Sequence, residues 1–136
     1  MPFIVDNSVV CGWFLTNQAT DYTEAIAQRL LDDTAIAPGL WPLELANVLR
    51  TACKRGAMVA QRAQDISAEI ANLPIAIDAA PPSAAALLAL ALRFDLTSYD
   101  AAYLELALRL QLPIATQDAA LMQAAMAAGV GVVQGN

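Results

Sequence analysis

The chain has 136 residues, the length of one domain (residues 1–136), and 58% of them are hydrophobic, which suffices for a buried core. Its 13 acidic and 7 basic residues give a formal net charge of −6, unlike the cationic surface typical of proteins that bind nucleic-acid phosphates. The absence of histidine excludes Ser-His-Asp and Cys-His catalysis and histidine-ligated zinc, so carboxylates are the first candidates for chemistry.

Short apolar runs alternate along the chain with stretches of helical composition. In chain order we expect a strand at Phe3–Asp6, helices at Ser8–Leu15 and Tyr22–Leu31, a strand at Ala35–Ala37, helices from Trp41 to about Arg55 and at Val59–Asn72, a strand at Ile75–Ile77, helices at Pro82–Arg93 and from Thr97 to about Leu110, a strand at Leu112–Ala115, a helix at Gln117–Ala127 and a fifth strand at Gly131–Val133. This alternation indicates an α/β domain with a mostly parallel sheet. The strands lack an in/out pattern, which is typical of strands covered by helices on both faces.

The sequence argues against a membrane protein and against export. No charge-free run offers the ~20 continuous apolar residues of a spanning helix, and the longest one before residue 93 is interrupted by Pro81 and Pro82. The N-terminal residues contain no basic stretch and reach Asp6 at once, so we expect no secretion signal. Cys11 and Cys53 are too few and too far apart for a disulfide framework, and we expect buried, reduced thiols in a cytoplasmic protein.

Four of the 13 acidic residues stand at the ends of expected elements: Asp6, Glu44, Asp100 and Asp118. Asp6 ends the first strand and Asp118 follows the fourth, and ligands of open parallel sheets bind beyond the carboxyl ends of strands. Converging carboxylates repel one another unless a cation intervenes, and oxygen ligands alone favour Mg²⁺ or Mn²⁺ over zinc. Such a site can activate a water and stabilise a phosphate during in-line displacement, which fits phosphodiester hydrolysis.

Each acid also has a structural interpretation. Acids in the first turn of a helix complement its dipole. The segment from Thr97 to Asp100 is similar to a capping box, Thr116 is a candidate cap for the helix that carries Asp118, and Asp6 is a candidate cap for the first helix. The sequence alone leaves both interpretations open.

The helix that begins near Trp41 carries a polar stripe. Glu44, Asn47 and Thr51 fall at positions i, i+3 and i+7 of an otherwise apolar helix, which indicates either a solvated face or a face turned toward a site. Three basic residues lie near the end of the same helix: Arg50, Lys54 and Arg55. They are either a phosphate-binding edge or the solvated side of the helix.

Four segments, in order, resemble the motifs of the PIN domain. They are Asp-x-Ser in Ile4–Ser8, Glu-x-x-Asn in Pro42–Leu49, Tyr-Asp-Ala-x-Tyr in Leu96–Ala107 and Thr-x-Asp in Leu112–Asp118. The order, the spacing and the total length are similar to stand-alone PIN proteins of the VapC toxin type, and the match covers essentially the whole chain.

The resemblance implies a five-stranded parallel sheet of order 3-2-1-4-5 flanked by helices, and an endoribonuclease dependent on Mg²⁺ or Mn²⁺. It carries over seven positions, the catalytic and metal-binding acids and then their hydrogen-bonding neighbours: Asp6, Glu44, Asp100 and Asp118, with Ser8, Asn47 and Thr116. We expect three of the acids to hold Mg²⁺ and Glu44 to bind a second ion or orient the attacking water. The expected partners are RNA, a second copy of the chain, and a cognate antitoxin that places an Arg or Lys in the acidic site.

Three other interpretations remain open. One is a PIN nuclease of RNA maturation or decay, and another is an α/β module that only binds a partner, against which the intact carboxylates at all four positions argue. A receiver-like signalling domain would use Asp78, after the third strand, as its phosphorylated residue. That fold usually needs paired acids after the first strand and a lysine after the last, whereas here Asn7 follows Asp6 and the last lysine is Lys54.

Overall fold

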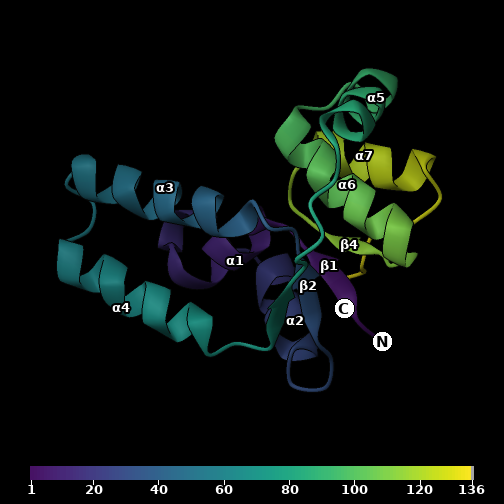
Figure 1. The fold of residues 1–136 in the computed structure, drawn as a ribbon. Coiled ribbons are helices and arrows are strands. Elements are labelled where there is room, and N and C mark those ends of the chain that lie inside the picture. The colour runs from purple at the N-terminus through teal and green to yellow at the C-terminus, as the bar shows by residue number, and fades with distance from the viewer. Residues whose placement is uncertain (136) are drawn as a thin grey trace.

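Four short strands form one parallel sheet in the computed structural model, which describes residues 1–135 (Figure 1). The strands are β1 (Phe3–Val5), β2 (Ala35–Ala37), β3 (Ile75–Ile77) and β4 (Ile114–Ala115). They lie in the order β3-β2-β1-β4, and every neighbouring pair is parallel. The expected α/β class with a parallel sheet is therefore confirmed.

The fifth strand expected at Gly131–Val133 is wrong. This segment meets β4 through one isolated parallel bridge between Ile114 and Val132. Two hydrogen bonds accompany the bridge, from Ile114 N to Gly131 O at 3.1 Å and from Val133 N to Ile114 O at 2.9 Å. Gly131 has a φ of +83°, outside the extended region, so the segment turns at the point where a strand would begin. Over residues 1–135 the sheet has four strands instead of five.

The expected helices form, with ends shifted by one or two residues. They are α1 (Asn7–Phe14), α2 (Asp21–Arg29), α3 (Trp41–Lys54), α4 (Ala60–Ala71), α5 (Ala84–Phe94), α6 (Ser98–Leu110) and α7 (Ala119–Ala127), with an unexpected short 3₁₀ helix, η1 (Thr16–Gln18), after α1. Helix α5 begins later than expected because Ser83 caps it, accepting a hydrogen bond from Ala86 N at 3.1 Å. No helix within residues 1–135 has the length and apolarity needed to cross a bilayer.

Helices cover both faces of the sheet, and the two cores meet at β1. Phe3 and Val5 belong to a core with residues of α1 to α4, whereas Ile4 belongs to a core with residues of α6 and α7. Successive side chains of a strand point to opposite faces, so β1 is buried on both. Figure 1 shows α3 and α4 extending from one side of the sheet and α5, α6 and α7 gathered on the other. The residue that follows β1 therefore emerges between the two helical layers.

Helices α1 and α2 approach so closely at Gly12 that a side chain has no room there. A Cβ atom on Gly12 would lie 2.4 Å from Cγ2 of Thr23, which is itself buried. We expect Gly12→Ala to lower the free energy of unfolding by about 1 kcal/mol or more, although alanine is the better helix former. Urea unfolding measures this, with Gly39→Ala as the control, since its nearest contact would be an ordinary 3.5 Å. A Gly12→Ala protein as stable as the wild type would contradict this packing.

Candidate functional site

Asp6 is a buried carboxylate held by two hydroxyl groups. It is 5% exposed, and its Oδ2 accepts hydrogen bonds from Ser8 Oγ at 2.7 Å and from Thr116 Oγ1 at 2.8 Å. Burial raises the pKa of Asp6, and the two hydrogen bonds act against that rise. Although Asp6 precedes α1, its side chain makes no capping hydrogen bond, so the capping interpretation is wrong for this residue.

The same two hydroxyls join the loops that follow β1 and β4. Ser8 Oγ accepts a hydrogen bond from Gln117 N at 3.0 Å, and Thr116 Oγ1 accepts one from Asp118 N at 3.0 Å. Each hydroxyl therefore donates to Asp6 and accepts from the chain beyond β4. This arrangement fixes the position of Asp118 relative to Asp6.

Asp118 has a structural role as well as a place in the site. It is the N-cap of α7, and its Oδ2 accepts a hydrogen bond from Leu121 N at 2.8 Å. Thr116, expected as a possible cap of this helix, lies two residues before the N-cap and instead donates a hydrogen bond to Asp6. The capping bond engages one oxygen of the Asp118 carboxylate.

Asp100 lies in the first turn of α6 and faces the other acids. Its backbone N donates to Thr97 Oγ1 at 3.1 Å, so Thr97 caps the helix by itself. Burial, followed in order of importance by the charges of Asp118, Asp6 and Glu44, raises the pKa of Asp100 to about 6. Carboxylates from three other segments are thus close enough to act on Asp100.

Glu44, in the first turn of α3, receives a hydrogen bond from the core of the protein. Tyr103 OH donates to Glu44 Oε1 at 2.6 Å, and Tyr103 has no exposed surface. Burial raises the pKa of Glu44, the hydrogen bond from Tyr103 lowers it, and the charge of Asp6 raises it again. Tyr103 was expected only as a member of the Tyr-Asp-Ala-x-Tyr segment, yet its position three residues after Asp100 puts both side chains on one face of α6.

Two further side chains support the site and were missed by the sequence analysis. The Gln117 side chain donates to the carbonyl oxygens of Ser8 (3.1 Å) and Gln18 (3.2 Å), and accepts from Thr20 Oγ1 at 2.8 Å. Asn7 Oδ1 accepts a hydrogen bond from Trp41 Nε1 at 3.1 Å inside the core. Only their positions next to motif residues could have drawn attention to them.

Asn47 does not join the hydrogen-bonding network around the acids. It is exposed on α3, one turn beyond Glu44, and no hydrogen bond of its side chain occurs within residues 1–135. Asn47 and Thr51 both line a cavity beside α3. Of the three residues expected around the carboxylates, Ser8 and Thr116 therefore contact Asp6, and Asn47 does not.

We define the acidic cluster as Asp6, Glu44, Asp100 and Asp118, and within residues 1–135 no basic side chain pairs with it. In the described part of the chain none of its members forms an ion pair; the acids that do are Asp33, Glu69, Asp78 and Glu105. Within residues 1–135, no group of three or more acidic, cysteine or histidine side chains is arranged closely enough to hold a metal ion. The donors are carboxylate oxygens, which suit a hard cation such as Mg²⁺.

The two cysteines do not belong to the acidic cluster. Cys11 is buried, and burial together with the charges of Asp6 and Glu44 raises the pKa of its thiol to about 11. Cys53 is free and partly exposed, whereas we expected it to be buried. The Cys11 thiol is therefore not activated as a nucleophile by its surroundings.

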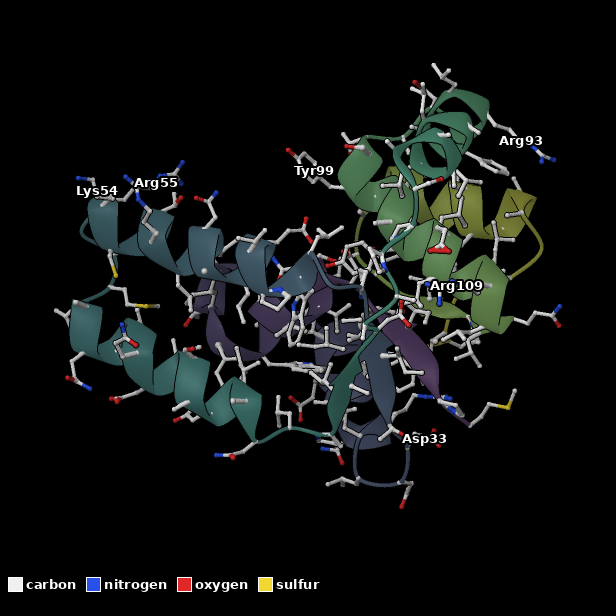
Figure 2. The ribbon with its side chains drawn as sticks, in the orientation of Figure 1. Asp33, Lys54, Arg55, Arg93, Tyr99 and Arg109 are labelled. Carbon is white, nitrogen blue, oxygen red and sulfur yellow. The ribbon has the colours of Figure 1, made fainter. Side chains whose placement is uncertain are left out.

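Asp78, the residue on which a receiver-like interpretation depends, lies apart from the acidic cluster. It follows β3 at the edge of the sheet, with β2 between that strand and β1. Arg109 Nη2 contacts its Oδ2 at 2.8 Å, and this hydrogen bond lowers the pKa of Asp78. Figure 2 shows Arg109 near the C-terminal end of α6.

We expect Tyr103→Phe to raise the pKa of Glu44, because the hydrogen bond that lowers it is removed while the ring is kept. Above the pKa of Glu44 the variant should also lose about 1 kcal/mol of stability. Carboxyl ¹³C NMR titration checks the pKa and urea unfolding checks the stability. Tyr99→Phe is the matched control, since Tyr99 is 62% exposed. An unchanged Glu44 titration in Tyr103→Phe would count against the contact.

The raised pKa of Asp100 makes stability fall with rising pH. The folded protein binds the Asp100 proton more tightly, so this contribution is complete below about 3.8 and is lost as pH rises through about 6. We expect Asp100→Asn in EDTA to be more stable than the wild type at pH 7.5. The difference should be about 1 kcal/mol, allowing for solvent screening, and should vanish near pH 3.5. A pH-independent difference in urea unfolding would contradict this.

Comparison with known proteins gives a fold and nothing finer. No family model matches the chain, and no curated protein matches it. Among solved structures, the chain is similar to the crystal structure of PAE2754 from Pyrobaculum aerophilum, with a TM-score of 0.67 and 20% sequence identity. The match covers 91% of this chain and 79% of that one. At this identity the likeness shows the α/β fold alone, and the PIN resemblance stays a prediction.

Proposed function

We propose that this protein is a cytoplasmic endoribonuclease of the PIN type that hydrolyses RNA phosphodiesters with Mg²⁺ or Mn²⁺. The observation that carries the proposal is the acidic cluster. Carboxylates from four separate segments gather at the carboxyl edge of the sheet around the buried Asp6, and no cation within residues 1–135 pairs with them. Gathering like charges without a partner is costly, so such clusters are typical of functional sites.

Different residues of the chain have different roles in such a site. Ser8 and Thr116 orient Asp6 through their hydroxyl groups, while Asp100 and Asp118 supply further oxygens from α6 and from the start of α7. A divalent ion bound there supplies positive charge at the phosphate and lowers the pKa of a water molecule. Tyr103 holds one oxygen of Glu44, which leaves the other to orient a water or to bind a second ion.

The negative net charge does not argue strongly against RNA. Four of the 13 acidic residues belong to the acidic cluster, so the remaining surface is nearly balanced against the 7 basic residues. A bound divalent ion would offset two of the four charges of the acidic cluster itself. Phosphate attraction is then local to the site and to any basic edge beside it.

We extend the proposal to the toxin of a toxin–antitoxin pair, acting as a homodimer. The unpaired acidic cluster is suited to an Arg or Lys from a basic antitoxin, which would neutralise the carboxylates without metal. A role in RNA maturation or decay requires the same chemistry but no such inhibitor. A neighbouring gene for a small basic DNA-binding protein would favour the toxin.

Cleavage of end-labelled structured RNA tests the proposed chemistry. Wild-type protein should cut at discrete sites with Mg²⁺ or Mn²⁺ and stay inactive in EDTA. Asp100→Asn should lower the rate by about 100-fold or more while circular dichroism shows an intact fold. Asp95→Asn is the matched control, because Asp95 is an exposed C-cap with a φ of 54°, which asparagine tolerates.

The other outcomes are equally informative. Equal cutting by the wild type and Asp100→Asn would identify a contaminating nuclease. No cutting by any of the proteins across several RNAs would contradict hydrolysis and favour a binding-only module. Unfolding of Asp100→Asn would show that the carboxylate is required for α6 itself.

A further inference from the structure

A cavity of about 530 Å³ opens between the second half of α3 and the end of α1. Its volume lies within the range of ~300–1,000 Å³ found for small-ligand sites. Phe14 and Met58 contribute apolar surface. The polar side chains of its lining are amides, hydroxyls and one guanidinium: Thr16, Asn17, Gln18, Asn47, Thr51 and Arg55. We call this cavity the α3 groove.

The polar stripe of α3 connects the α3 groove to the acidic cluster. Asn47 and Thr51 follow Glu44 by three and seven residues, so the three side chains lie along one face of the helix. Arg55, directly after α3, is eleven residues beyond Glu44, or ~16 Å along the helix axis. A stacked strand advances ~3.4 Å per nucleotide, so this distance accommodates several nucleotides.

The charge of the α3 groove is opposite to that of the acidic cluster. No carboxylate is among its lining residues, and α3 contains no acid after Glu44. Three of the seven basic residues lie near this end of the helix, and none forms an ion pair within residues 1–135: Arg50, Lys54 and Arg55. Figure 2 shows Lys54 and Arg55 at the end of α3 away from the sheet. An anionic ligand is therefore favoured there.

We infer that the α3 groove is a nucleotide subsite, which holds one unstacked nucleotide of a single-stranded RNA, a few nucleotides along the strand from the phosphodiester at the acidic cluster. The base packs against Phe14 and Met58, the amide side chains meet base edges, and Arg55 binds a phosphate. The inference rests on the proposed function. A basic antitoxin segment is the poorer occupant, because it would find Arg55 and no carboxylate in the groove.

The phosphate contact is tested by binding, in a background that does not cut. Fluorescence anisotropy of a labelled single-stranded oligoribonucleotide is measured with Mg²⁺ and Asp100→Asn protein. Adding Arg55→Gln should raise Kd about ten-fold or more and should lower the slope of log Kd against log salt by about 0.7. Arg93→Gln is the control of equal charge; Arg93 lies on α5, on the opposite side of the molecule from α3 in Figure 2.

The cavity itself is tested by filling it. Thr51→Leu puts a larger apolar side chain into the α3 groove and is compatible with a helix, so it should raise Kd while thermal unfolding stays unchanged. Thr51→Ser keeps the hydroxyl without filling the space and should bind as the parent does. A Thr51→Leu protein that binds as tightly as Thr51→Ser overturns the base-binding part of the inference.

The experiments distinguish a failure of the proposed hydrolysis from a failure of the nucleotide subsite. If the wild type binds RNA through Arg55 and Thr51 but never cuts it, the nucleotide subsite stands and the proposed hydrolysis fails. If RNA is cut as proposed while Arg55→Gln and Thr51→Leu bind it like their controls, hydrolysis stands and the subsite is overturned. The second result would leave the α3 groove to a protein partner.

Discussion

The parallel pairing of β1 with β4 determines where the acids of the cluster lie. Ile4 pairs with Ile114 and Val5 with Ala115, so Asp6 and Thr116 leave the sheet side by side at its carboxyl edge. The core around Ile4 includes Tyr103 of α6, which brings that helix, and Asp100 with it, over the same edge. A register shift of one residue would turn Asp6 toward the opposite face and separate it from Thr116.

The fold gathers these charges without neutralising them. Hydroxyl groups of Ser8, Thr116 and Tyr103 stabilise two of the four carboxylates, whereas an ion pair with a buried arginine would have served stability better. Burial raises the pKa values of Asp6, Glu44 and Asp100, which is the direction expected for carboxylates that are costly to ionise in place. Such local instability is commonly retained where a site must bind a cation or an oppositely charged partner.

The sequence is most informative about features that depend on neighbouring residues. Apolar runs and Pro, Gly and Ser punctuation predicted the strands β1 to β4 and the helices within two residues. The fifth strand was wrong because Gly131 takes a backbone conformation that its apolar neighbours do not reveal.

Individual side-chain contacts between distant segments could not be predicted from the spacing of residues. Tyr103 and Glu44 are 59 residues apart, and no spacing rule connects them. The choice between capping and clustering depended on which atoms each carboxylate presents: Asp118 caps α7, whereas Asp6 caps nothing.

The length of sequence between Asp6 and β4 also has a consequence for biosynthesis. Asp6 and Thr116 are 110 residues apart, yet they share a hydrogen bond at the centre of the site. At ~5–20 residues per second, a ribosome needs on the order of 5–20 s to make the chain between them. During that interval β1 has no β4 to pair with, and the acidic residues already made have no common centre. Whatever activity the acidic cluster has is therefore silent on the nascent chain and begins only when nearly all of the sheet has been translated.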